Sequence, residues 1–299
     1  MKATAQILPA VPLAEKGWVA VFADLVKARL TMLVLLTTLV GFYLGTRGAV
    51  DVALLLHTLL GTALVASGAA ALNELLEREH DARMRRTASR PLPAGRMQPG
   101  TVLVLGTVFA VAGLVWLALG TNWVTCAVAG ISLVTYLFLY TPLKRVTWLN
   151  TLVGAVPGGL PPLIGWTAAQ GGLTSAGWSL FAILACWQIP HFMAIAWMYR
   201  DEYAKAGFVM LPVVDASGRR TARQAVAFAG LLLAASVWPY FLGLVGVTYL
   251  VGAVVLGVGF LALAVLFARE LNLPRARQLF FASIIYLPLL LGLMALAKR

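Results

Sequence analysis

The sequence predicts an all-α polytopic membrane protein, with nine transmembrane helices in one bundle and the N-terminus in the cytoplasm. Of the 299 residues, 61% are hydrophobic and only 11% are charged, whereas soluble domains are nearer half apolar and a quarter charged. The apolar residues form continuous runs of the length that crosses a bilayer, about 20 residues. A membrane β-barrel would instead show short segments of alternating polarity.

The chain begins with an expected flexible cytoplasmic arm at 1–17, where Pro9 and Pro12 disfavour a helix. Residues 18–29 mix apolar and charged positions, which is typical of a helix entering the membrane from its surface. The remainder, 18–299, is expected to form a single helical domain.

Nine apolar runs follow, and two longer polar segments between them, 74–100 and 198–223, are the expected active-site loops. The fifth run contains several glycines and prolines, so we expect a kinked or broken helix there. The runs cover 30–45, 52–73, 101–119, 123–140, 150–168, 178–197, 224–244, 249–267 and 280–296.

The basic residues predict the orientation of these spans. If the N-terminus is cytoplasmic, 20 of the 23 lysines and arginines fall on the cytoplasmic side, and only Arg47, Lys298 and Arg299 fall outside. Such an imbalance is the usual sign of membrane orientation. It places both polar loops on the cytoplasmic face. It also explains the net charge of +12 without a nucleic-acid partner.

The most informative polar stretch runs from Asn73 to Pro91. Asn73, Glu77 and Asp81 are four residues apart, so on a helix they share one face. An arginine cluster follows at once. Mg²⁺ takes oxygen ligands and usually shares them with substrate phosphates, and arginine binds phosphate through two parallel hydrogen bonds. The stretch therefore indicates a site for an anionic ligand and a divalent cation. The alternative is a solvated loop whose charges only orient the protein.

Four stretches point to one family: KARLTMLVLLTTLVGFYLG from Lys27, NELLEREHDARMRRTASRPLPAGRM from Asn73, YTPLKRVTWLN from Tyr140 and WQIPHFMAIAWMYRDEYAKAGFVMLPVV from Trp187. Together they closely resemble the protoheme IX farnesyltransferase (haem O synthase) branch of the UbiA-type intramembrane prenyltransferases. The resemblance runs from about residue 27 to the last span. The RTASRP and WQIPHF segments are the parts that narrow it to the haem branch.

The resemblance implies that Asn73, Glu77 and Asp81 bind Mg²⁺ and the prenyl diphosphate. A second acidic motif reads DxxxD in the quinone-type members, but this chain has Asp201 followed by Glu202. Asp201 is therefore the expected second metal ligand. Lys205 is better suited to diphosphate than to a metal.

The resemblance also implies the substrates, farnesyl diphosphate and haem b, and the product, haem O, for haem A/O-type terminal oxidases. The cations Arg86, Arg90, Lys144 and Lys205 would contact phosphate oxygens or the haem propionates, and the residue types do not divide these two tasks among them. Arg145 and Asn150 lie beside them and are expected to line the haem site. The implied location is the bacterial cytoplasmic (inner) membrane. The resemblance also suggests contact with a haem A synthase or with the machinery of oxidase assembly.

His191 has two interpretations. Histidine is a common ligand of haem iron, and ionisable groups inside spans are frequently functional. Alternatively, it is hydrogen-bonded within the bundle and plays no part in the reaction.

The sequence leaves three other functions to consider. A prenyltransferase for an aromatic acid or a chlorophyll-like ring is disfavoured by the haem-branch segments and by the missing DxxxD. A transporter would place its charged residues near mid-membrane, whereas here they cluster at one end. A haem chaperone would not need metal ligands at this four-residue spacing.

Overall fold

The computed structural model describes residues 17–299, so the expected arm lies outside the described residues apart from Gly17. In this part of the chain the only β pairing is an isolated antiparallel bridge between Val245 and Lys298. Nine helical segments here are long and apolar enough to cross a membrane, as the sequence predicts. The cytoplasmic position of the N-terminus stays a prediction.

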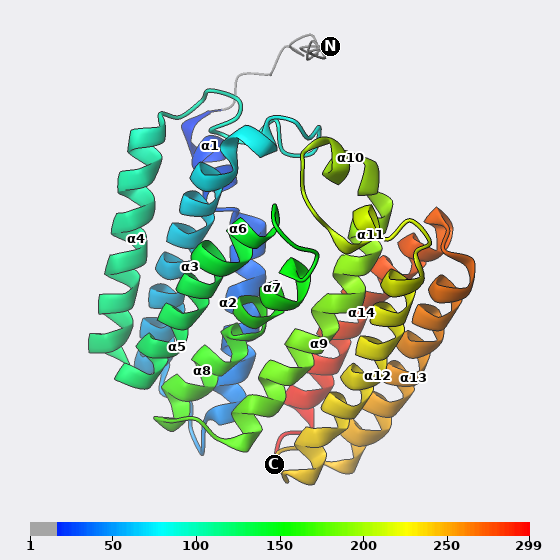
Figure 1. Cartoon of the computed structure of the whole chain (residues 1–299). Helices are drawn as coiled ribbons and strands as arrows, with labels where there is room; N and C mark the ends of the chain where they lie inside the picture. The colour runs from blue at the N-terminus through cyan, green and yellow to red at the C-terminus, as the bar shows by residue number, and fades with distance from the viewer. Residues whose placement is uncertain (1–16) are drawn as a thin grey trace, which may run out of the picture.

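The nine spans run along the bundle in alternating directions (Figure 1). They are α2 (Ala28–Gly45), α3 (Val52–Asp81), α4 (Pro99–Gly120), the segment Trp123–Leu143, the segment Asn150–Gln170, α9 (Ser175–Met198), α12 (Arg219–Phe241), α13 (Val247–Glu270) and α14 (Leu273–Leu296). Short helices at the end of the bundle that also holds the first described residues are α1 (Trp18–Leu25), α10 (Arg200–Lys205) and α11 (Leu211–Val214).

Two of the spans are interrupted. Trp123–Leu143 consists of α5 (Trp123–Val134), the π-helix η1 (Thr135–Tyr140) and α6 (Thr141–Leu143). Asn150–Gln170 consists of α7 (Asn150–Gly159) and α8 (Pro161–Gln170). The break at Leu160 confirms the predicted interruption, and its cause is the pair Pro161 and Pro162, which lack backbone N–H donors.

Helix α3 is longer than the sequence analysis expects. The predicted span ends at residue 73, but the helix continues to Asp81 and is 30 residues long. That corresponds to about 45 Å, which exceeds the roughly 30 Å apolar thickness of a bilayer. Residues 74–81 therefore belong to the helix rather than to a loop. Their polarity led to the wrong boundary, although Leu, Glu and Arg are good helix formers.

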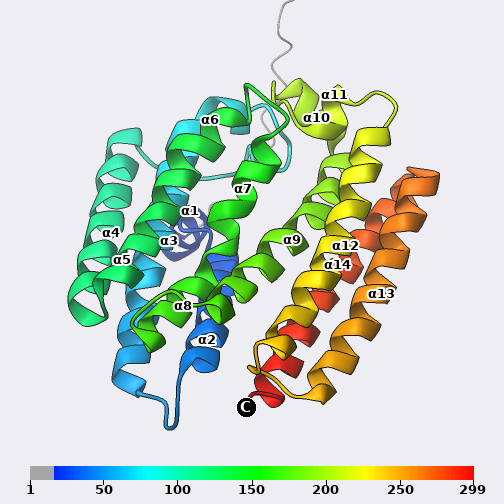
Figure 2. The same cartoon turned by 60° about the horizontal axis from the view of Figure 1, so that its bottom comes forward.

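Two apolar cores are the largest of the four in the described residues. One gathers Val65, Leu117 and Leu163, from α3, α4 and α8. The larger core lies among α9, α12, α13 and α14, with Leu232 and Phe260 among its buried members. Figure 2 shows α3 and α4 on one side of α7–α9, and α12 and α13 on the other. Many large apolar side chains outside these cores are exposed, as expected for a surface that contacts lipid.

Helices α2 and α8 approach unusually closely. A Cβ at Gly41 would lie 1.9 Å from the Pro162 carbonyl oxygen, and one at Gly165 would lie 1.9 Å from the Thr38 carbonyl oxygen. Only glycine allows this distance. The contact fixes the interrupted fifth span against the first.

Candidate active site

The last turns of α3 carry the three predicted oxygen ligands on one face. Asn73, Glu77 and Asp81 are 1%, 3% and 2% exposed, so these three side chains, hereafter called the ladder, are buried together. The helix ends directly after it, where the Thr87 hydroxyl donates a hydrogen bond to the Asp81 carbonyl oxygen at 2.8 Å. This bond satisfies a carbonyl that would otherwise lack a partner at the helix end.

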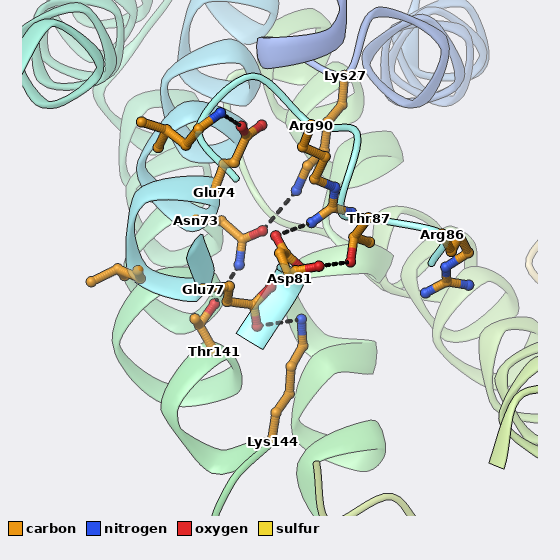
Figure 3. A network of polar contacts seen from close by, with 12 residues as sticks. Lys27, Asn73, Glu74, Glu77, Asp81, Arg86, Thr87, Arg90, Thr141 and Lys144 are labelled. Atoms are coloured by element: carbon orange, nitrogen blue, oxygen red, sulfur yellow. Dashed lines mark hydrogen bonds and ion pairs between the residues drawn. The ribbon is translucent and has the colours of Figure 1, made fainter. Parts of the chain in front are cut away.

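Each member of the ladder contacts a different cation (Figure 3). Lys27 Nζ donates to Asn73 Oδ1 at 2.7 Å. Lys144 Nζ lies 2.8 Å from Glu77 Oε1, and Arg90 Nη1 lies 2.5 Å from Asp81 Oδ2. Three basic side chains thus face two carboxylates and one amide.

The Lys27 backbone is held in an uncommon conformation. Its φ is 48°, in the left-handed region that costs a non-glycine residue roughly 1 kcal/mol. The residue stands between α1 and α2 and turns the chain into the first span. Burial lowers the pKa of Lys27 to about 7, and the nearby cations Arg90 and Lys144 contribute to this decrease.

Lys144 differs from Lys27 in its surroundings. Burial opposes its positive charge, but Tyr140 and Glu77 beside it hold the pKa of Lys144 above its ordinary value. Its ammonium lies 4.5 Å from the centre of the Tyr140 ring, a favourable cation–π distance. Lys144 therefore remains charged, with Glu77 as its partner.

Two further polar residues position the ladder. The Asn73 amide Nδ2 donates to the Thr141 hydroxyl at 3.0 Å, and that hydroxyl donates to the carbonyl oxygen of Tyr136 in η1 at 2.8 Å. Glu74 is fully buried and accepts the Leu92 N–H at 2.8 Å. The first contact orients the Asn73 oxygen toward Lys27, and the second holds the loop after α3 against the helix.

The second polar segment meets the first at the same end of the bundle. Arg86 Nη2 donates to the Tyr203 hydroxyl at 3.0 Å and stacks over that ring and the Tyr199 ring. Val209 N–H donates to the Lys144 carbonyl oxygen at 2.7 Å. The two predicted loops are therefore in direct contact, although Arg86 is set apart from the ladder (Figure 3).

Several predicted site residues lie outside the ladder. Asp201 has a side chain 88% exposed and lies 3.8 Å from Arg200, and Lys205 is exposed on α10. Arg145 donates to the Leu76 carbonyl oxygen at 2.6 Å. Asn150 donates to the Val209 carbonyl oxygen at 2.8 Å, so its amide holds the second polar segment in place.

His191 lies between two aromatic rings, at 4.9 Å from Trp187 and 5.1 Å from Phe280. Its Nδ1 is 2.7 Å from the Ser283 hydroxyl. That hydroxyl donates its hydrogen to the Phe280 carbonyl oxygen at 2.5 Å, so the Nδ1–H must be the donor to Ser283. The unprotonated nitrogen is then Nε2, which is the state in which a histidine binds a metal.

The ladder suits a hard divalent cation that shares its coordination with phosphate. Within 17–299 no group of three His, Cys, Asp or Glu side chains is arranged to hold a metal. Mg²⁺ does not require one, because it is usually held by one or two carboxylates together with substrate oxygens. Asn73, Glu77 and Asp81 supply an amide and two carboxylates on one helical face, so this donor set fits Mg²⁺.

Comparison with known families identifies the family of this chain. The model of the UbiA prenyltransferase family matches residues 34–285. The chain belongs to the UbiA prenyltransferase family.

Similar members of the family are named protoheme IX farnesyltransferases. The protein of that name from Solibacter usitatus is 49% identical over 286 residues, which cover 93% of this chain and 98% of the relative. The one from Salinibacter ruber is 45% identical, and the match covers 91% of this chain and 95% of the relative. A mitochondrial relative of the same name from Arabidopsis thaliana is 38% identical, and the match covers 90% of this chain and 63% of the relative.

Solved UbiA-type structures share the fold at low sequence identity. A digeranylgeranylglyceryl phosphate synthase superposes with a TM-score of 0.79 at 18% identity, covering 93% of this chain and 98% of that one. A UbiA homologue from Archaeoglobus fulgidus, solved with DMAPP and Mg²⁺, superposes with a TM-score of 0.64 at 15% identity. The match covers 91% of this chain and 98% of that one. Both comparisons support the nine-helix arrangement.

Sequence reasoning did not assign roles to Lys27, Thr141 or Glu74 in this UbiA-type site. Glu74 lies within the polar stretch but off the four-residue spacing. Thr141 and Lys27 lie 68 and 46 residues from Asn73 in the chain, so no local pattern connects them to it. The position of Lys27 directly before the first span was the one sequence feature that could have indicated a role in the site.

Proposed function

We propose that the protein transfers the farnesyl group of farnesyl diphosphate to a vinyl group of haem b, giving haem O and diphosphate. The observation that carries the proposal is the buried ladder of Asn73, Glu77 and Asp81, whose members each face a separate cation. The names of the similar UbiA-type relatives supply the identity of the two substrates.

In this proposal Asn73, Glu77 and Asp81 hold Mg²⁺ together with diphosphate oxygens. The bound ion supplies positive charge that stabilises the departing diphosphate. Support comes from the donor set itself and from the UbiA homologue solved with DMAPP and Mg²⁺. Asp201 lies outside this set on α10, so its predicted role as a further ligand requires the α10 segment to move toward α3.

The three ladder cations would then bind the diphosphate. Lys27, Arg90 and Lys144 hold the ladder oxygens in the structure. With a metal ion bound to the ladder oxygens, the same cations would contact phosphate oxygens and offset the charge that grows on the leaving group. Arg86 and Lys205, at the edge of the site, would contact either the diphosphate or the haem propionates.

Ionisation breaks the bond between the farnesyl carbon and its oxygen, and the electron pair leaves with the diphosphate. The haem vinyl group then bonds to the farnesyl carbon. Water adds to the resulting cation beside the macrocycle and releases a proton, which gives the hydroxyethylfarnesyl group. The first cation must be kept from water. The partly buried Tyr136 and Tyr140 rings stack 5.8 Å apart, and the Tyr140 ring lies beside the Lys144 ammonium of the site.

His191 is the residue that we propose to contact the haem iron. Its Nδ1–H is fixed by Ser283, and Nε2 keeps its lone pair. Arg145 and Asn150 hold backbone near the ladder, so their contribution to haem binding would be to shape the site. We further propose that the enzyme resides in the bacterial cytoplasmic membrane, with its polar end cytoplasmic and with contact to haem A synthase or oxidase assembly.

The test is turnover by purified protein given haem b and farnesyl diphosphate, with Mg²⁺ or with chelator. Mass spectrometry of the extracted haems should show Mg²⁺-dependent hydroxyethylfarnesyl haem. Recovery of unchanged haem b, together with prenylation of 4-hydroxybenzoate, would reject haem as the acceptor while retaining the family reaction.

A further inference from the structure

The end of the bundle opposite the ladder has a hollow in which basic side chains converge. Among residues 17–299, three lysines or arginines lie at this end: Arg47, Lys298 and Arg299. All three line the same cavity, whose volume is about 840 Å³. The other lysines and arginines of the described chain lie toward the ladder end.

The hollow lies at the seam between the two groups of helices. One wall is the end of α2 with residues 45–48, together with Trp166 and Gln170 of α8. The other wall is the beginning of α9 at 174–176, the turn at 242–244 and the chain end at 298–299. A ligand held here would contact both halves of the bundle.

The hollow is electrostatically suited to an anion. Within the described chain no acidic side chain lines it. Lys298 Nζ donates to the Tyr43 carbonyl oxygen and, at 2.7 Å, to the Thr46 carbonyl oxygen. Burial lowers the pKa of Lys298. The first turn of α9 adds the partial positive charge of a helix N-terminus.

The rim of the hollow is apolar on the side that faces outward. Tyr43 and Leu242 line it and are each 38% exposed. Phe241 and Leu296, next to lining segments, are 73% and 88% exposed. A soluble anion would make no use of this surface, whereas an amphiphile would place its apolar part there.

We infer that this hollow binds the phosphate headgroup of an anionic phospholipid from the adjoining leaflet, with Arg47 and Arg299 contacting the phosphate. Basic pockets between transmembrane helices are suited to such headgroups, and arginine binds phosphate through two parallel hydrogen bonds. The bound lipid spans the seam, so it stabilises the association of the two halves. This site is distinct from the proposed diphosphate site and does not depend on the proposed reaction.

The test measures lipid binding to delipidated full-length protein by native mass spectrometry, with phosphatidylglycerol and phosphatidylcholine titrated separately. The test variant is Arg47→Gln with Arg299→Gln, and the matched control is Arg277→Gln, an exposed arginine at the ladder end. Lys298 is left intact because it holds backbone carbonyls. A lipid-free thermal unfolding transition close to that of the wild type shows that the double variant is folded.

We expect the wild type to retain phosphatidylglycerol in preference to phosphatidylcholine. The double variant should bind phosphatidylglycerol about tenfold or more weakly, as expected for lost charge-assisted hydrogen bonds, while Arg277→Gln leaves binding unchanged. Phosphatidylglycerol should raise the unfolding temperature of the wild type but not of the double variant. Equal affinity for both lipids, or an equal loss in Arg277→Gln, would overturn the inference. So would inorganic phosphate or glycerol 3-phosphate competing as strongly as the lipid, because the ligand would then be a soluble anion.

Discussion

Lys144 and Glu77 form an ion pair with 2.8 Å between Nζ and Oε1, and it joins residues 67 positions apart in the chain. The two side chains are only 16% and 3% exposed. The pair connects the end of α3 to the turn after α6. Because removal of either partner leaves a buried charge without compensation, the ladder and its cations act as a single electrostatic unit.

The first prediction concerns this pair. Glu77→Gln leaves the Lys144 ammonium without its carboxylate, and we expect the free energy of unfolding to fall by about 3 kcal/mol. The matched control is Glu79→Gln on the same helix, where the side chain is 72% exposed; it should change stability by less than about 0.5 kcal/mol. Thermal unfolding in detergent measures both, and equal shifts would contradict the account. Adding Lys144→Met to Glu77→Gln should recover part of the loss.

The second prediction tests the close contact between α2 and α8. Gly165→Ala places a Cβ where the Thr38 carbonyl oxygen stands, so the helices must separate, at a loss of about 1–3 kcal/mol. Gly259→Ala on α13, where a Cβ would meet no atom within 4 Å, is the control and should leave stability unchanged or slightly higher. The unfolding temperatures of the two variants should therefore move apart. Tolerance of alanine at residue 165 would show that the helices are not fixed by this contact.

The helical architecture could be predicted from sequence because the membrane imposes it locally. Continuous apolar runs and the excess of basic residues on one side indicate nine spans, and the prolines indicate the interruption near Pro161. The predicted end of α3, at residue 73, was wrong because residues 74–81 are polar and were assigned to a loop. Their place in a helix depends on burial of Glu77 and Asp81 against basic side chains from elsewhere in the chain.

The site was predictable only where its pattern is local. The four-residue spacing of Asn73, Glu77 and Asp81 identified the ladder, and the resemblance supplied Arg90 and Lys144. The contact of Lys27 with Asn73 spans 46 residues, which spacing cannot reveal. Asn150 was expected beside haem, and the structure shows its amide bonded to the Val209 carbonyl oxygen.

The third prediction is a dependence of stability on pH. Asp215 lies outside the spans and accepts hydrogen bonds from Thr221 N–H at 2.9 Å and the Thr221 hydroxyl at 3.0 Å. Burial opposes its charge, but these bonds and one from Ser217 lower the pKa of Asp215 below its ordinary value. The folded state therefore binds this proton less readily than the unfolded state. The stabilisation is present above the unfolded pKa, about 4, and is lost as pH falls through the lower folded value.

Asp215→Asn removes the titrating group at the start of α12 and should reduce the loss of stability between pH 5 and the acid end of the folded range. Unfolding temperature measured against pH gives the comparison. Glu79→Gln serves as the control and should follow the wild type. An unchanged acid profile in Asp215→Asn would show that this carboxylate does not contribute to the acid sensitivity.

The fourth prediction separates the two interpretations of His191. His191→Phe preserves an aromatic ring between Trp187 and Phe280 but removes the nitrogen ligand. If Nε2 contacts the haem iron, the absorption change of the Soret band on haem titration should be lost while binding of farnesyl diphosphate persists. His57→Phe is the control, because His57 packs on Trp116 near the opposite end of α3. Identical haem spectra for wild type and His191→Phe would assign His191 a packing role.

The central claim is that the ladder and its cations form a diphosphate site completed by Mg²⁺. The most direct measurement is equilibrium binding of farnesyl thiodiphosphate, a slowly reacting analogue, to purified protein with Mg²⁺ or with chelator. Wild type should bind it in a Mg²⁺-dependent manner, and Asp81→Asn should lose that dependence together with at least tenfold in affinity. Tight binding that is insensitive to chelator and unchanged in Asp81→Asn would contradict the account and place the diphosphate elsewhere.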